Sequence, residues 1–149
     1  MSGKSRSGAF RRFENTEVYR FLWLRTFRHP VAATLERNVD HFELRSVELD
    51  GAGGYAPGKI LSTGRKSITQ EVWCQFTGLL DKAAYWKIPS NSRDDMGYDG
   101  SQWILEGVKD GRYHIVDRWT PQTGEYREAC LFVLKLSGRS FENLKKDLY

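Results

Sequence analysis

Residues 103–119 read WILEGVKDGRYHIVDRW, and this stretch decides the fold. Asp110-Gly111 stands between two runs rich in aromatic and branched residues. A two-residue Asp-Gly connection favours a type I′ turn, because both central residues of that turn need positive φ. We therefore predict a β-hairpin formed by residues 103–109 and 112–119.

The two-residue turn also predicts which hairpin residues lie opposite one another. The expected pairs are Leu105 with Val116, Gly107 with His114, Trp103 with Arg118 and Glu106 with Ile115. Because side chains alternate between the two faces of a strand, His114 and Arg118 should share one face. Glu106 should lie on the other face, together with Asp117.

Four further strands are predicted upstream of the hairpin, over residues 18–27, 31–37, 42–49 and 59–68. The first is apolar on both faces, which indicates a central position in a sheet. The fourth is more polar and carries Lys and Arg, which is typical of an edge strand.

Two amphipathic helices are predicted from apolar residues that recur at intervals of three and four. One follows a cap at Thr69 or Ser67 and runs to about Trp86, and the other covers residues 125–136 and ends before Gly138. Their apolar stripes are Val72, Trp73, Phe76, Leu79, Leu80, Ala83 and Ala84 in the first, and Tyr126, Ala129, Cys130, Val133 and Leu136 in the second.

The order of elements predicts an α+β fold, in which an antiparallel sheet of about six strands is covered on one face by both helices. A four-strand meander, a helix, a hairpin and a helix follow one another along the chain. The length suits one domain, which we place at residues 17–138. A tail or short helix should follow over residues 139–149.

The basic charge of the chain is concentrated at its N-terminus. Residues 1–16 hold four basic residues against one acidic, which leaves 19 basic and 18 acidic side chains elsewhere. A basic, Ser/Gly-rich end is typical of a disordered arm. The nearly neutral remainder argues against nucleic-acid binding, and weak association through the arm stays as a third functional hypothesis.

No apolar run approaches the ~18 residues that a membrane span needs, and residues 1–7 lack the apolar stretch of a signal peptide. We expect a soluble cytoplasmic protein, or an exported one if a leader has been removed. Cys74 and Cys130 stand in different predicted helices, without a His or Cys at metal-ligand spacing. Buried free thiols are expected, with a disulfide as the alternative if the helices touch.

Residues 98–121, YDGSQWILEGVKDGRYHIVDRWTP, carry an Asp-Gly and Trp, then a Glu, then Gly-x-Tyr-His and Arg-Trp-x-Pro. This pattern resembles a group of small bacterial proteins with no established function. Residues 49–58 and 19–27 are similar to the same group, so the resemblance covers most of residues 19–138. It implies a bacterial source and a single-domain fold, and it implies no activity, cofactor or catalytic residue.

An enzyme hypothesis can be built on the charged residues in and before the hairpin. For a hydrolase acting on phosphoester or glycan bonds, the candidates are Asp99, Glu106, His114, Asp117 and Arg118. The predicted register separates Glu106 from His114, which weakens an acid/base pair. Arg118 opposite Trp103 is more typical of a cation–π contact than of a catalytic arginine.

Other chemistries lack their usual residues. There is no Gly-x-Ser-x-Gly turn and no cysteine beside a histidine, and the acidic loop around Asp94 and Asp95 lacks the alternating ligands of a calcium loop. We expect neither a metal nor a cofactor. The glycines of residues 51–58 could present N–H groups to an anion, although a tight turn is their more frequent use.

The leading hypothesis is a non-enzymatic protein-binding domain of the bacterial inhibitor or immunity type. Its partner would be contacted by the loops at residues 50–58 and 88–102, because aromatic residues in polar loops often anchor interfaces. The predicted binding residues are Tyr55, Met96, Tyr98, Trp103 and Arg118.

Overall fold

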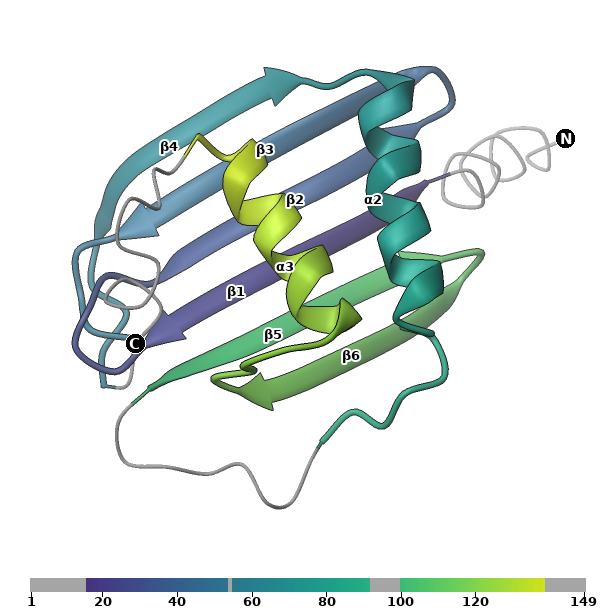
Figure 1. Cartoon of the computed structure of the whole chain (residues 1–149). Helices are drawn as coiled ribbons and strands as arrows, with labels where there is room; N and C mark the ends of the chain where they lie inside the picture. The colour runs from purple at the N-terminus through teal and green to yellow at the C-terminus, as the bar shows by residue number, and fades with distance from the viewer. Residues whose placement is uncertain (1–15, 54, 92–99, 139–149) are drawn as a thin grey trace, which may run out of the picture.

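The computed structural model describes residues 16–53, 55–91 and 100–138. The predicted tail, and the predicted arm apart from Thr16, lie outside the described residues. Figure 1 shows two layers, a six-stranded sheet and two helices that both lie across the same face of it. Among the described residues, no helix is long and apolar enough to cross a membrane.

The sheet is antiparallel throughout, with the strand order β4-β3-β2-β1-β5-β6. Its strands are β1 (Glu17–Arg25), β2 (Val31–Asn38), β3 (His41–Leu49), β4 (Ile60–Ser67), β5 (Ser101–Lys109) and β6 (Arg112–Trp119). The predicted α+β fold is confirmed. So are the central position of the first strand, between β2 and β5, and the edge position of the fourth.

The hairpin of β5 and β6 has the predicted register. Leu105 lies opposite Val116, Trp103 opposite Arg118 and Glu106 opposite Ile115. Asp110 and Gly111 have φ values of 51° and 72°, as a type I′ turn requires. The distribution of side chains between the two faces follows from this turn.

Helix α2 (Gln70–Lys82) begins after Thr69, whose hydroxyl accepts a hydrogen bond from the Val72 N–H at 3.1 Å. The predicted extension to about Trp86 is wrong. Ala84 has a φ of 49°, which ends the helix and turns the buried Tyr85 toward the sheet. The Tyr85 hydroxyl lies 3.0 Å and 2.8 Å from two backbone carbonyls, of β5 and β6 respectively.

Helix α3 (Glu125–Leu136) buries a wider stripe than predicted. Leu131 and Leu134 are buried in addition to the predicted Ala129, Cys130 and Val133. The reason is that α3 packs on α2 as well as on the sheet, with the rings of Phe76 and Phe132 stacked at 6.3 Å. A helix with two neighbours buries more of its surface than a single stripe.

Neither cysteine is bridged, and the two thiols differ in exposure. Cys130 is fully buried, as predicted, and burial raises the pKa of its thiol. Cys74 is exposed, so the prediction that both would be buried is wrong. The apolar stripe of α2 passes beside Cys74 through Trp73 and Phe76, which places Cys74 on the solvent side of the helix.

Candidate functional site

The candidate catalytic residues of the hairpin lie on two different faces of the sheet. Glu106 and Asp117 lie on the face that α2 and α3 leave uncovered, here named the open face. His114 lies on the helix-covered face, where its ring contacts Tyr85 at 5.1 Å, and Arg118 shares that face. The predicted separation of Glu106 from His114 is confirmed.

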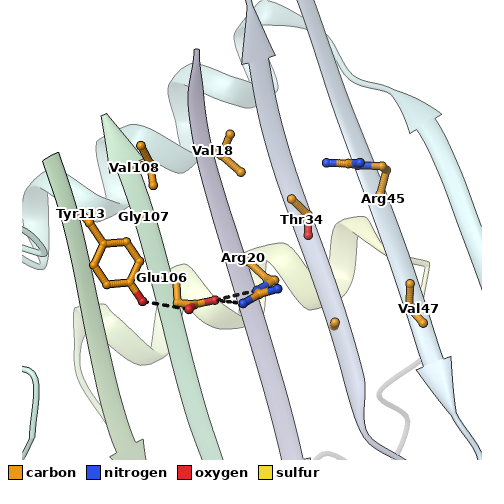
Figure 2. A pocket seen from close by; sticks show the side chains of 10 residues that line it. Val18, Arg20, Thr34, Arg45, Val47, Glu106, Gly107, Val108 and Tyr113 are labelled. Atoms are coloured by element: carbon orange, nitrogen blue, oxygen red, sulfur yellow. Dashed lines mark hydrogen bonds and ion pairs between the residues drawn. The ribbon is translucent and has the colours of Figure 1, made fainter. Parts of the chain in front are cut away.

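On the open face, Glu106 holds together three neighbouring strands. Arg20 of β1 donates through Nε to one carboxylate oxygen at 2.6 Å, and Tyr113 of β6 donates its hydroxyl to the other at 2.9 Å. Figure 2 shows these groups in a hollow of about 500 Å³ that extends across β5, β1, β2 and β3. The lining residues are Val18, Arg20, Ala32, Thr34, Arg45, Val47, Glu106, Gly107, Val108 and Tyr113.

The hydrogen bonds around Glu106 are better suited to stabilising its carboxylate in place than to transferring protons in a reaction. Both oxygens of Glu106 already accept hydrogen bonds, and an arginine lies against one of them. The hydrogen bond to Glu106 raises the pKa of the Tyr113 phenol, so this phenol stays protonated at neutral pH. The hollow therefore offers polar contacts at its centre.

We predict that Glu106→Gln lowers the pKa of Tyr113 back toward the usual value near 10. Arg20→Gln should raise it further, because the guanidinium charge opposes the effect of the carboxylate. Below its raised pKa, the Tyr113 phenol is protonated and donates its hydrogen bond to Glu106. This hydrogen bond is lost as the pH rises through that pKa, because the phenolate has no proton to donate. Titration of the Tyr113 ring carbons by NMR measures both shifts. Equal pKa values in the three proteins would contradict the network.

Asp117 acts in two structural contacts. Its carboxylate accepts a hydrogen bond from the Gln102 amide at 2.7 Å, and its backbone N–H donates to the Ser90 carbonyl at 2.8 Å. Asp117 therefore joins the neighbouring strand and the segment before β5, and its carboxylate does not meet His114.

Arg118 and His114 hold the segment that runs along the outer edge of β6. Arg118 donates to the carbonyls of Pro89 and Ser90 at 2.7 Å and 3.1 Å, and His114 Nε2 lies 3.0 Å from the Ile88 carbonyl. The predicted cation–π contact between Arg118 and Trp103 is wrong. The two residues are opposed as expected, but the guanidinium is drawn to carbonyl oxygens that the sequence pattern did not place there.

The predicted binding residues have different positions. Tyr55 is 77% exposed, whereas Trp103 is fully buried in the core and so is not a surface contact in this fold. Arg118 is half-buried by the carbonyls it binds. Met96 and Tyr98 lie outside the described residues, as do the candidate acids Asp94, Asp95 and Asp99.

Sequence reasoning missed most of an apolar surface at one end of the sheet. Phe27 follows β1, Tyr55 lies between β3 and β4, and Ile60 and Leu61 begin β4, so all four lie at the same end (left in Figure 1). Their exposed fractions are 70%, 77%, 67% and 55%, and the rings of Phe27 and Tyr55 are 6.2 Å apart. We name these four residues the Tyr55 patch.

A second hollow adjoins the Tyr55 patch on the open face. It has a volume of about 260 Å³ and an almost wholly apolar lining. The lining consists of Leu22, Leu24, Pro30, Val31, Ala32, Val47, Leu49, Gly53, Tyr55, Ala56 and Pro57. The alternating apolar residues of β1 were the signal for this surface, but only the sheet order brings them beside the loop that contains Tyr55.

Several N–H groups of the glycine-rich loop beside this hollow are bonded to carbonyls of the described chain. Gly51 donates to Pro57, Ala52 to Ala56 and Gly53 to Arg28, at 3.1 Å, 2.8 Å and 3.0 Å. A Cβ at Gly53 would lie 2.7 Å from backbone atoms of Arg25, which leaves no room for a side chain. The loop is therefore a tight turn packed on the end of β1, and the anion-binding alternative is not supported.

Within the described ranges, no group of three or more His, Cys, Asp or Glu residues is arranged to hold a metal ion. Comparison with known proteins places no further constraint on the site. No protein-family model matches the chain, and no curated protein matches it significantly.

Proposed function

We propose that this protein is a non-enzymatic protein-binding domain whose partner contacts the Tyr55 patch and the apolar hollow beside it. The observation that carries the proposal is the position of the exposed hydrophobic residues. Of the seven large hydrophobic residues that are exposed in the described part of the chain, four lie at this end of the sheet, and the other three are Val39, Val108 and Tyr113. Concentrated apolar surface on a folded domain is typical of an interaction site.

The hollow favours one large side chain as the partner's anchor. Its volume of about 260 Å³ lies below the ~300–1,000 Å³ of most small-molecule pockets. Burial of one large apolar side chain contributes about 1.5–3 kcal/mol, which is the scale of an interface anchor. Tyr55 borders the hollow and combines an apolar ring with a hydroxyl, a combination enriched in interfaces.

A hydrolase has weaker support. Glu106 and Asp117 lie on the open face, whereas His114 and Arg118 lie on the covered face and bind backbone carbonyls. An acid and a base that are separated by a sheet cannot act on one bond. An inhibitor or immunity protein of the kind suggested for a bacterial chain needs only the binding surface.

The partner can be captured by placing a photo-crosslinking amino acid at Ala56, the exposed neighbour of Tyr55 in the lining of the hollow, in cells that produce the protein. The purified partner is then titrated against the double variant Phe27→Ser/Tyr55→Ser. We expect affinity to fall by roughly 30-fold or more, since loss of an interface anchor costs about 2 kcal/mol or more. Thermal stability should change little, because both side chains are exposed.

The matched control is Val39→Ser/Tyr113→Ser. These residues are 72% and 59% exposed and lie at the opposite end of the sheet. The control should bind the partner as the unmodified protein does. Equal affinity of the Phe27→Ser/Tyr55→Ser variant, or equal loss in both double variants, would contradict the proposal.

A further inference from the structure

The two edge strands of the sheet, β6 and β4, differ in the hydrogen bonding of their outer edges. At β6, the Asp117 N–H donates to Ser90, Asn91 forms a parallel bridge to Asp117, and Arg118 binds the carbonyls of Pro89 and Ser90. At β4, all eight residues are exposed, and no other part of the described chain pairs with the outer edge. Among the described residues, the outer edge of β6 is therefore paired near its end at Asp117, whereas the outer edge of β4 is paired nowhere.

The hydrogen-bond pattern identifies the backbone groups that face outward from β4. The Ile68 N–H donates to the Phe42 carbonyl at 3.0 Å, which marks a hydrogen-bonded pair of the antiparallel ladder. Inward and outward groups alternate along such a strand. The N–H and C=O groups of Thr63, Arg65 and Ser67 therefore point away from β3, at the spacing that an added strand requires.

The side chains along this edge are basic. Residues 59–68 contain Lys59, Arg65 and Lys66 and no acidic residue. Arg65 forms an ion pair with Glu43 of β3, so Lys59 and Lys66 carry the charge that an added strand would meet. Lysines on an edge strand discourage indiscriminate pairing. A second copy joined through β4 would bring these two lysines together with two more, whereas an acidic segment would be attracted.

We propose that β4 accepts an extended, acidic segment of the partner protein as a seventh strand of the sheet. Backbone hydrogen bonds to the outward groups provide the affinity, and the basic side chains select the acidic sequence. The inference rests on the proposed protein-binding function. It extends the same surface, because Ile60 and Leu61 belong both to the Tyr55 patch and to the start of β4.

A synthetic probe tests this mode of binding. The peptide acetyl-Thr-Val-Thr-Glu-Glu-Val-Thr-Val-amide presents one acid to each face of the sheet when extended. We expect it to bind the full chain with an affinity that falls as salt rises, and to slow amide hydrogen exchange at Thr63, Arg65 and Ser67. The same peptide with two lysines in place of the glutamates should not bind.

Two variants separate strand addition from attraction of charges. Thr63→Pro removes an outward N–H and leaves the ladder to β3 intact, a position where proline is tolerated. It should weaken binding of the acidic peptide roughly tenfold or more while the melting temperature changes little. Lys59→Glu/Lys66→Glu should reverse the preference toward the lysine peptide.

Three results would overturn the inference: no binding of the acidic peptide, equal binding by the folded Thr63→Pro variant, or a dimer of the unmodified chain that Thr63→Pro dissociates. Failure of strand addition can be distinguished from failure of the proposed protein-binding function. If the captured partner needs Phe27 and Tyr55 but binds the Thr63→Pro variant normally, strand addition fails and the protein-binding function stands.

Discussion

Replacement of Trp103 by alanine is expected to lower the free energy of unfolding by about 3–5 kcal/mol. The side chain is fully buried, its ring meets Phe21 edge-on at 5.6 Å, and its Nε1 donates to the Ser101 hydroxyl at 2.7 Å. Alanine would leave a cavity between the sheet and the helices and remove the donor. Urea denaturation followed by circular dichroism measures the loss.

The matched control for this prediction is Tyr55→Ala. Tyr55 is also aromatic and was also predicted to bind a partner, but it is 77% exposed. Its removal should change stability by less than about 0.5 kcal/mol. Similar losses in the two variants would show that Trp103 does not lie in the core.

Gly107→Ala is expected to destabilise the protein by about 1–3 kcal/mol, because it overfills the core. A Cβ at this position would lie 2.9 Å from ring atoms of Tyr19 and 3.0 Å from the ring of Tyr85. Neither ring is free to move, since the Tyr19 hydroxyl donates to Glu17 and the Tyr85 hydroxyl binds carbonyls of the hairpin. Thermal denaturation measures the change.

Gly78→Ala should change stability in the opposite direction. Gly78 lies inside α2, and no atom lies within 4 Å of the Cβ that alanine would add. Alanine loses less conformational entropy than glycine on entering a helix, so this variant should gain about 0.5–1 kcal/mol. A gain at both glycines, or a loss at both, would contradict the packing described for Gly107.

The sequence was sufficient to predict those features of the structure that depend on residues close together along the chain. Asp110-Gly111 needs only its own backbone to form the turn, and alternation along the strands then sets the faces of Glu106 and His114. The cap at Thr69 is equally local, because its hydroxyl reaches the Val72 N–H of the next turn. These features were predictable because few residues, close along the chain, decide them.

The predictions that failed concern features that depend on residues far apart along the chain. The end of α2 was placed too late because Tyr85 gains contacts with the hairpin that outweigh one more helical turn. The Arg118 guanidinium was misplaced because the carbonyls it binds belong to residues 28 and 29 positions earlier in the chain. Helix periodicity and strand alternation contain no information on such contacts.

The sequence by itself determined the elements, the hairpin register and the distribution of side chains between faces, because turn geometry and hydrophobic period act over a few residues. Only the tertiary structure decided that β5 joins the free side of β1, which pairs Arg20 with Glu106 across 86 residues. Within the described residues, the same packing leaves one face without a helix and the outer edge of β4 without a paired strand, and it brings Phe27 to Tyr55. The candidate surface therefore arises from long-range strand pairing, whose choice depends on the burial of the whole core.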